Sequence, residues 1–383
     1  MENYTVSQLM RLAKRHHNTK RTYLLVDPLQ GKHIPVSPSE SLEMLRTLGR
    51  RYAETAPETD LVIGFAETAT AVGAAVASML PGCRYIHTTR EPAALTGGRI
   101  EFREEHSHAA EQYLCTDLLG EWLKDARSIA FVDDELSTGK TLLNMIAEIR
   151  RSFPEIAGKD IRTVSIINLL TDERIAALGA EGVRCVSLLR LPMNDLTAEV
   201  EKYAIAAPEN ASAAEPDRIP ILTGPVTEDP RSGCLIADFL EQCNRMNGTV
   251  RGQLAGHTEG RRITVLGTEE WMLPGLLLGE YIEKYGKAAS VRFHATTRSP
   301  IGICTDPEYP IRSGVRLHSF YEENRETYLY DLQECDTVII LTDSPDSTAV
   351  RKAYEDLCGV YAALGCNDII LIREDAHVRY LSK

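Results

Sequence analysis

The chain of 383 residues lacks the features that mark several large protein classes. Its 9 cysteines are scattered and form no C-x-x-C pair, so the sequence indicates neither a zinc ribbon nor a redox dithiol, and reduced thiols are expected. The longest nearly apolar run, AVGAAVASML at 71–80, is far shorter than the ~20 residues needed to cross a bilayer. The first residues have no apolar signal-peptide core. We therefore expect a cytoplasmic protein without a membrane partner.

Positive charge is also scarce, because 42 Lys and Arg residues face 55 Asp and Glu residues and leave a net charge of −13. Such a surface repels phosphate backbones, so no nucleic acid partner is expected, although a small anion can still be bound locally. The length suits two domains of about 150 to 200 residues each.

Short β-branched runs alternate with longer amphipathic segments in both halves, for example TDLVIGFAE, SIAFVDDE and, later, RRITVLG and DTVIILTDS. This alternation predicts an α/β fold with two α/β domains, in which a parallel sheet is flanked by helices. The intervening stretch AIAAPENASAAEPDRIPI offers no apolar face. We predict a first domain at 1–205, a linker at 206–221 and a second α/β domain at 222–383.

The two halves share sequence at a nearly constant spacing. IHTTREP recurs as HATTRSP, with an offset of 208 between Arg90 and Arg298, and SIAFVDD recurs as TVIILTD, with an offset of 209 between Asp134 and Asp343. We infer that the second domain is a degenerate repeat of the first. The alternative is that two α/β domains share only generic strand patterns.

The most informative stretch is IAFVDDELSTGKT, in which an apolar strand runs into two acids. At the carboxyl end of a parallel strand, side chains face the crevice where open α/β sheets bind ligands. Asp133 and Asp134 repel each other there, and the cost is offset by hydroxyl donors or a divalent cation. A ribose diol with Mg²⁺ supplies both, with the metal held directly or through water.

The turn that follows the acids has the composition of a phosphate cradle. It combines hydroxyls, a permissive glycine and the N–H groups of a helix N-terminus. Its residues are Ser137, Thr138, Gly139, Lys140 and Thr141. Acids and turn together fit a pentose 5-phosphate.

Two other interpretations of this stretch are weaker. A Walker A loop needs a glycine where Asp134 stands. A solvated turn with ordinary caps explains Ser137 but not the paired acids on the strand edge.

These residues resemble the phosphoribosyl-pyrophosphate (PRPP) motif of type I, orotate phosphoribosyltransferase-like phosphoribosyltransferases. The resemblance implies that Asp133 and Asp134 hold the ribose hydroxyls and act in catalysis, and that 137–141 hold the 5′-phosphate. GFAETATAVG resembles the family's pyrophosphate loop. It implies further PRPP-binding residues, namely Glu67, Thr68, Ala69 and Thr70.

A charged segment between Thr88 and Gln112 suits a lid that excludes water and brings cations to the leaving group. Within it we expect Arg90 and Arg103 near pyrophosphate as catalytic residues, the alternative being a solvated hairpin. The same segment carries Arg99, His106 and His108. Lys32 and His33 are weaker candidates for the base or diphosphate side.

The whole chain resembles the subgroup encoded with bacterial tellurium-resistance and stress genes, which carries a C-terminal TRSP domain named for residues matched here by 297–300. The resemblance implies an Mg²⁺-dependent glycosyltransferase that joins PRPP to a small base-like substrate, or runs in reverse, and a homodimer. The alternative is a non-catalytic PRPP or nucleotide sensor.

Substrate and second-domain predictions follow from single residues. 6-Oxopurine enzymes have an Asp where this chain has Ser137, which cannot act as a base unaided, so hypoxanthine and guanine are disfavoured.

In the second half, LTDSPDSTAV keeps Asp343 but lacks the second acid, the glycine and the lysine, and Pro345 removes a backbone donor. A competent PRPP site is not expected there.

Overall fold

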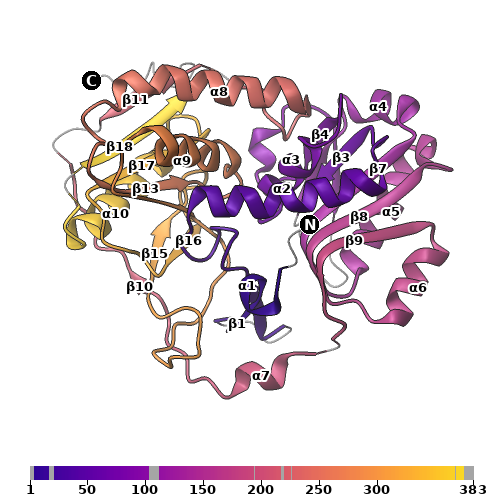
Figure 1. Cartoon of the computed structure of the whole chain (residues 1–383), viewed down its shortest axis with the longest axis horizontal. Coiled ribbons are helices and arrows are strands. Elements are labelled where there is room, and N and C mark those ends of the chain that lie inside the picture. The colour runs from indigo at the N-terminus through magenta and orange to yellow at the C-terminus, as the bar shows by residue number, and fades with distance from the viewer. Residues whose placement is uncertain are drawn as a thin grey trace. The chain divides into compact units, whose positions relative to one another are not determined.

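The computed structural model describes residues 4–16, 21–102, 112–193, 195–216, 220–225, 227–366 and 368–374. They form two compact units, whose elements are traced in Figure 1. Unit 1 contains the described residues of 1–5, 43–194 and 228–241, and unit 2 those of 6–42, 195–227 and 242–383. Each unit is built on a mostly parallel sheet with helices packed on it, so the predicted α/β fold class is confirmed.

Unit 1 holds a six-stranded sheet with the order β12-β4-β3-β7-β8-β9. All neighbouring pairs are parallel except that β12 runs antiparallel to β4. The strands are β3 (Leu61–Gly64), β4 (Arg84–His87), β7 (Ser128–Leu136), β8 (Asp160–Asn168), β9 (Val183–Arg190) and β12 (Cys234–Leu235). The predicted acid-bearing strand is β7, at the centre of this sheet.

The sequence of β7 explains its place. Its first five residues, 128–132, are buried, as expected for a central strand covered on both faces, and exposure begins only at Asp133. Helix α3 (Thr70–Ala77) consists of small side chains, all of them buried, and packs on β3, β4 and β7. A Cβ on Gly73 would lie 3.1 Å from the Gly64 Cα, so glycine permits this close approach.

Helix α5 (Lys140–Ser152) buries residues at helical spacing, Leu142, Met145, Ile146 and Ile149, in one core with β3 and β7. The other elements of unit 1 complete its framework. They are most of α2 (Pro38–Thr55), η1 (Pro92–Ala94), the hairpin β5 (Arg99–Phe102) and β6 (Gln112–Cys115), α4 (Leu119–Asp125), η2 (Pro154–Ile156) and α6 (Asp172–Ala180).

Unit 2 holds a five-stranded parallel sheet with the order β11-β18-β17-β13-β14. Its strands are β11 (Ile221–Gly224), β13 (Arg262–Gly267), β14 (Ser290–Ala295), β17 (Thr337–Leu341) and β18 (Asp368–Glu374). Helix α9 (Leu273–Tyr285) packs on β13, β14 and β17, and α10 (Thr348–Ala363) shares a core with β17 and β18.

Smaller elements surround this sheet. A second sheet has the order β10-β15-β16, and β1 pairs with β2. The remaining elements of unit 2 are α1 (Val6–Leu9), β1 (Arg11–Lys14), β2 (Tyr23–Val26), α7 (Thr197–Glu201), β10 (Glu209–Asn210), most of α8 (Ile236–Gln253), β15 (Gly314–His318) and β16 (Glu326–Tyr330).

The two sheets repeat one plan. The order β4-β3-β7-β8 in unit 1 corresponds to β14-β13-β17-β18 in unit 2. The correspondence extends to single hydrogen bonds: Thr88 N donates to Gly64 O (2.9 Å), and Thr296 N, 208 residues later, donates to Gly267 O (3.0 Å). The strand order and these bonds support the inferred duplication.

Each unit also takes an edge from a distant part of the chain. In unit 1, β12 pairs with β4 through Cys234 and Tyr85. In unit 2, Val36 forms an antiparallel bridge to Phe293 of β14. The described residues of the segment predicted as a linker, 206–221, belong to unit 2, where β10 pairs with β15. The compact units are therefore interleaved in sequence, and the boundaries drawn at 205 and 222 stay a prediction.

Candidate functional site

Three connections leave the carboxyl edge of the unit 1 sheet side by side. Gly64 at the end of β3 is in register with His87 of β4 and Val132 of β7. The residues that follow these positions are therefore neighbours at one edge. They are the predicted pyrophosphate loop, the TTR segment with Arg90, and the acid-bearing end of β7.

Asp133 is the most perturbed group at this edge. Asp133 is half-buried, and desolvation by burial raises the pKa of its carboxyl well above the ordinary value. The adjacent Asp134 carboxylate raises the pKa further, while the Asp134 N–H, which donates to Asp133 Oδ1 at 3.0 Å, opposes this effect. Within the described residues no cationic side chain pairs with Asp133. The site therefore carries a cost that a cation or hydroxyl donors would relieve.

The predicted phosphate turn forms the start of α5. Gly139 has φ 73°, a left-handed conformation that favours glycine, and its peptide leads into the first turn of the helix. Lys140 N donates to Thr138 Oγ1 at 3.3 Å. Thr138, Lys140 and Thr141 are exposed, and Ser137 is half-buried. The turn therefore presents hydroxyls and a helix N-terminus at the surface beside the acids.

Arg174, which sequence reasoning missed, lies at the same turn. Its Nη1 donates to the Ser137 carbonyl oxygen at 3.2 Å from the first turn of α6. The TDERIAALG sequence predicts a capped helix there, with Thr171 accepting from Arg174 N. Nothing in its spacing links this arginine to a turn 37 residues earlier.

The predicted pyrophosphate loop connects β3 to α3. Glu67, Ala69 and Thr70 are buried and Thr68 is half-buried. The peptide bond between Ala66 and Glu67 is cis. Ala66 N donates to Thr88 Oγ1 at 2.8 Å, and this hydroxyl donates in turn to Gln112 Oε1 at 2.6 Å. The loop is thus tied to the segment that carries Arg90.

Of the two arginines predicted near pyrophosphate, only Arg90 lies within the described residues. Arg90 is half-buried directly after Thr89, whose backbone pairs with Tyr113 of β6. Arg103, His106 and His108 lie outside the described residues. Arg99 stacks over the Tyr113 ring, 5.0 Å from its centroid, and lies 3.6 Å from Glu101.

The corresponding edge of unit 2 is chemically different. Glu269, fully buried, accepts from Arg298 Nε at 2.8 Å, from Arg325 Nη2 at 3.0 Å and from Ser319 Oγ at 2.5 Å. Its backbone N donates to Thr296 Oγ1 at 2.9 Å, as Ala66 N does to Thr88 in unit 1. The buried acid at this edge therefore already has two cationic partners.

Two residues of the LTDSPDSTAV stretch and Lys32 have partners within unit 2. Asp343 accepts a hydrogen bond from the Tyr321 hydroxyl, and Ser347 caps α10 by accepting from Val350 N at 3.3 Å. Lys32, considered above for the base or diphosphate side, is fully buried in unit 2. Its Nζ donates to Glu269 O at 2.6 Å and Thr296 O at 2.9 Å.

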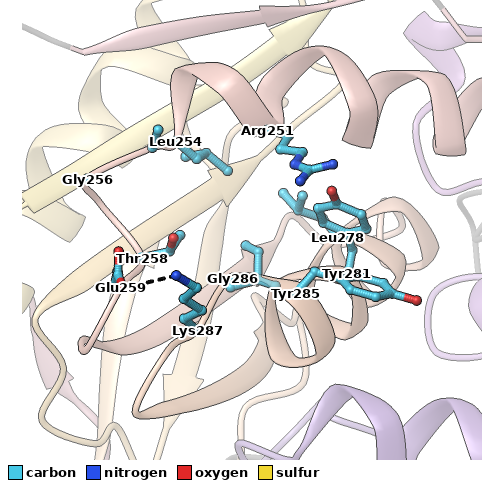
Figure 2. A pocket seen from close by; sticks show the side chains of 12 residues that line it. Arg251, Leu254, Gly256, Thr258, Glu259, Leu278, Tyr281, Tyr285, Gly286 and Lys287 are labelled. Atoms are coloured by element: carbon cyan, nitrogen blue, oxygen red, sulfur yellow. Dashed lines mark hydrogen bonds and ion pairs between the residues drawn. The ribbon is translucent and has the colours of Figure 1, made fainter.

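A separate pocket of about 210 Å³ lies in unit 2 between the end of α8 and the second half of α9. Figure 2 shows Tyr281, Tyr285 and Arg251 on its wall, with an ion pair of 3.3 Å between Lys287 and Glu259 at its rim. None of the predicted sugar-phosphate residues lines it. A second cavity of about 430 Å³ lies between β15 and α10 and is equally free of them.

Across the described parts of the chain, no group of three or more His, Cys, Asp or Glu side chains is placed to hold a metal ion. Two adjacent carboxylates suit Mg²⁺ only if water and substrate oxygens complete its shell. Of the helices in the described ranges, none is long and apolar enough to cross a bilayer.

Comparison with known families identifies the class. A family model described as phosphoribosyl transferase matches residues 9–190, and a model described as the TRSP domain C-terminal to that transferase matches 232–358. The chain belongs to this phosphoribosyl transferase family, which is a class of glycosyltransferases. Residues 232–358 form the TRSP domain that accompanies the transferase.

Solved structures resemble the chain over about half its length. The adenine phosphoribosyltransferase of Leishmania tarentolae is 20% identical, with 48% of this chain and 85% of that chain covered and a TM-score of 0.33. The orotate phosphoribosyltransferase of Aeropyrum pernix is 16% identical, with 47% and 88% covered and a TM-score of 0.30. Comparison with curated proteins finds no match. Family membership rests on the two family models.

Proposed function

We propose that this protein is an Mg²⁺-dependent phosphoribosyltransferase that moves ribose 5-phosphate from PRPP to a base-like acceptor, or catalyses the reverse reaction. One observation carries the proposal: the half-buried Asp133 carboxyl, next to Asp134 near the end of the central strand, lacks a cationic partner in the described residues, and desolvation raises its pKa. The phosphate turn begins three residues after Asp134. Acids and turn together match the two ends of a pentose 5-phosphate.

In the proposed reaction, the bond between C1 of the ribose and the diphosphate oxygen breaks, and a bond from C1 to the base nitrogen forms. The diphosphate leaves with the electron pair of the broken bond, and the N–H proton of the base passes to the diphosphate or to water. The state between is oxocarbenium-like, as in glycosyl transfer generally. Mg²⁺, when bound, supplies neutralising charge for the diphosphate.

The chain's own groups orient the reactants. Asp133 and Asp134 accept hydrogen bonds from the ribose hydroxyls, and the turn at 137–141 binds the 5′-phosphate. The 67–70 loop binds the diphosphate through backbone N–H groups, with Arg90 and Arg103 adding positive charge. Ser137 cannot take up the proton of the base unaided, which disfavours 6-oxopurines as acceptors.

The wider setting is proposed from the family resemblance alone. We expect a cytoplasmic homodimer that acts in nucleotide-like metabolism linked to tellurium-resistance and stress genes. The TRSP half, whose acid is already paired, would contribute to specificity, regulation or assembly.

The acids provide the decisive test. Because the double variant Asp133→Asn, Asp134→Asn removes both carboxylates but keeps their size, we expect it to lose Mg²⁺-PRPP binding, by at least about 100-fold, as measured by titration calorimetry. Asp343→Asn, which changes the corresponding acid of unit 2, is the matched control and should bind normally. Unchanged binding by the double variant contradicts the assignment.

Turnover separates the enzyme from the sensor. Release of pyrophosphate from PRPP should be measured with a panel of pyrimidine, adenine-like and unusual bases. Turnover on any of them supports the transferase. Tight PRPP binding with no turnover would favour a regulatory sensor.

A further inference from the structure

We propose that Arg174 binds the 5′-phosphate of the sugar substrate, a role that rests on the function proposed above and extends it. Phosphate sites at helix N-termini rely chiefly on backbone N–H groups and hydroxyls. The turn at 137–141 has both. Arg174 would add a guanidinium from a different element, α6, and so make the site selective for a dianion.

The fold places this arginine beside the turn. β8 lies next to β7, and Leu169 N, just past the end of β8, donates to Leu136 O at 2.8 Å. The chain then enters α6 at Asp172. A Cβ on Gly139 would lie 3.6 Å from Leu178 and 3.7 Å from Leu170. The turn therefore packs on the β8–α6 connection and on α6 itself.

The contacts of Arg174 leave its charge available. Within the described residues, its guanidinium makes one hydrogen bond, from Nη1 to Ser137 O at 3.2 Å, and no ion pair. A guanidinium carries five N–H donors, so further donors remain for an anion. The side chain is half-buried, which reduces both its screening by solvent and the entropy lost on binding.

Other arginines of unit 1 show the contrast. Arg162 Nε lies 3.0 Å from Asp160 Oδ2, and Arg150 Nη1 lies 3.2 Å from Glu181 Oε2. Each has a carboxylate partner within the protein. Arg174 has no carboxylate partner among the described residues and is held against a turn that suits a phosphate, so its charge fits a ligand better than a structural ion pair.

A purely structural role is the competing explanation. In that case Arg174 would only fix the Ser137 carbonyl and so shape the turn. The two roles differ in what they require. A glutamine amide can still donate to Ser137 O but carries no charge, whereas a lysine keeps the charge and loses the planar fork.

The test uses the full-length protein and two probes, ribose 5-phosphate and inorganic pyrophosphate with Mg²⁺, measured by calorimetry. For Arg174→Gln we expect ribose 5-phosphate to bind about tenfold more weakly, because a charge-assisted contact is lost. Arg174→Lys should lose less than about threefold. Pyrophosphate, which would occupy the 67–70 loop, should bind all forms equally.

Ionic strength gives a second readout that a structural role would not change. Ribose 5-phosphate affinity should fall more steeply with salt for the wild type than for Arg174→Gln. Arg150→Gln is the matched control: it removes an arginine near the far end of α5, about 15 Å along the helix, and should leave both probes unaffected.

Each outcome decides between the ideas. If the wild type binds PRPP and ribose 5-phosphate and Arg174→Gln equals it, the Arg174 proposal is wrong and the function stands. Equal losses in Arg174→Gln and Arg174→Lys, with unchanged salt dependence, also overturn it in favour of a structural role. If the wild type binds neither compound, the proposed function fails first.

Discussion

The sheet edges of the two units share a backbone plan but differ in how their buried acids are balanced. In unit 1, Asp133 has a neighbouring acid and, within the described chain, no cationic partner. In unit 2, Glu269 contacts Arg298 and Arg325. The hydrogen bonds that hold the two loops, Ala66 N to Thr88 and Glu269 N to Thr296, are nearly the same length, 2.8 and 2.9 Å. The two edges therefore differ in side-chain charge and not in backbone path. The acid of unit 1 is left for a ligand to neutralise, whereas the acid of unit 2 is neutralised by arginines of the protein.

The largest stability effect is expected from breaking the balanced edge. Glu269→Gln removes the fully buried carboxylate that two half-buried guanidinium groups share, and Arg325 then keeps its pair with the exposed Glu322. The loss should lower the free energy of unfolding of unit 2 by about 3–5 kcal/mol. Urea unfolding followed by hydrogen exchange in β13 measures it. The control is Glu323→Gln, since the exposed pair of Glu323 with Lys352, at 2.6 Å, should contribute at most about 1 kcal/mol. If Glu269→Gln lowers the free energy of unfolding by less than about 1 kcal/mol, the Glu269 carboxylate does not offset the charges of Arg298 and Arg325 as described.

A smaller effect should separate the loops by function. Thr88→Val and Thr296→Val each leave one buried backbone N–H without its acceptor, which costs about 1–3 kcal/mol in either unit. PRPP affinity, measured in parallel, should fall only for Thr88→Val, because only unit 1 is proposed to bind PRPP. Equal losses of affinity in both variants would erase the functional difference between the edges.

The smallest effect has the opposite sign. Since burial and Asp134 raise the pKa of Asp133, the native state binds this proton more tightly than the unfolded state does. The stability that this proton gives is present at low pH and is lost as pH rises through the native pKa. The free energy of unfolding of the wild type should therefore drop below that of Asp133→Asn as pH increases. We expect Asp133→Asn to be more stable at pH 8 by up to about 1 kcal/mol and equal near pH 3, in urea unfolding.

Asp160→Asn is the control for that sign. The Asp160 carboxylate lies 3.0 Å from Arg162 Nε and also contacts Arg184, so its removal should lower stability at pH 8. If Asp133→Asn also lowers stability at pH 8, the acid at the end of β7 is stabilising and the electrostatic contrast between the units is wrong.

Much of the edge could be predicted from sequence because it depends on contiguous residues. The strand with its two acids and the glycine turn lie in one stretch, and the repeated TTR segments predicted that the two halves share one α/β plan. Period and composition also predicted the α/β class. These signals are local, or repeat at a fixed offset, so one sequence contains them.

What the sequence did not reveal depends on long-range packing. Arg174 reaches Ser137 only because β8 pairs with β7 and α6 packs on Gly139. Lys32 stands in a Gly-Lys-His stretch that suggested a ligand, yet its ammonium is bound by two carbonyl groups of unit 2. The pairing of β12 with β4 and the bridge between Val36 and Phe293 could not be predicted from the sequence. Such edge pairing uses backbone groups that every residue has, so it leaves no sequence pattern.

The interleaved edges have a consequence for synthesis on the ribosome. Tyr85 of β4 emerges 149 residues before Cys234, its partner in β12, a delay of about 7–30 s at ordinary elongation rates. Val36 waits longer still for Phe293. The nascent chain therefore displays open strand edges, which invite wrong pairing, until translation is well advanced. Expression at reduced temperature or with added chaperones should raise the yield of folded protein, and cutting the gene between its two family-like halves should lower it.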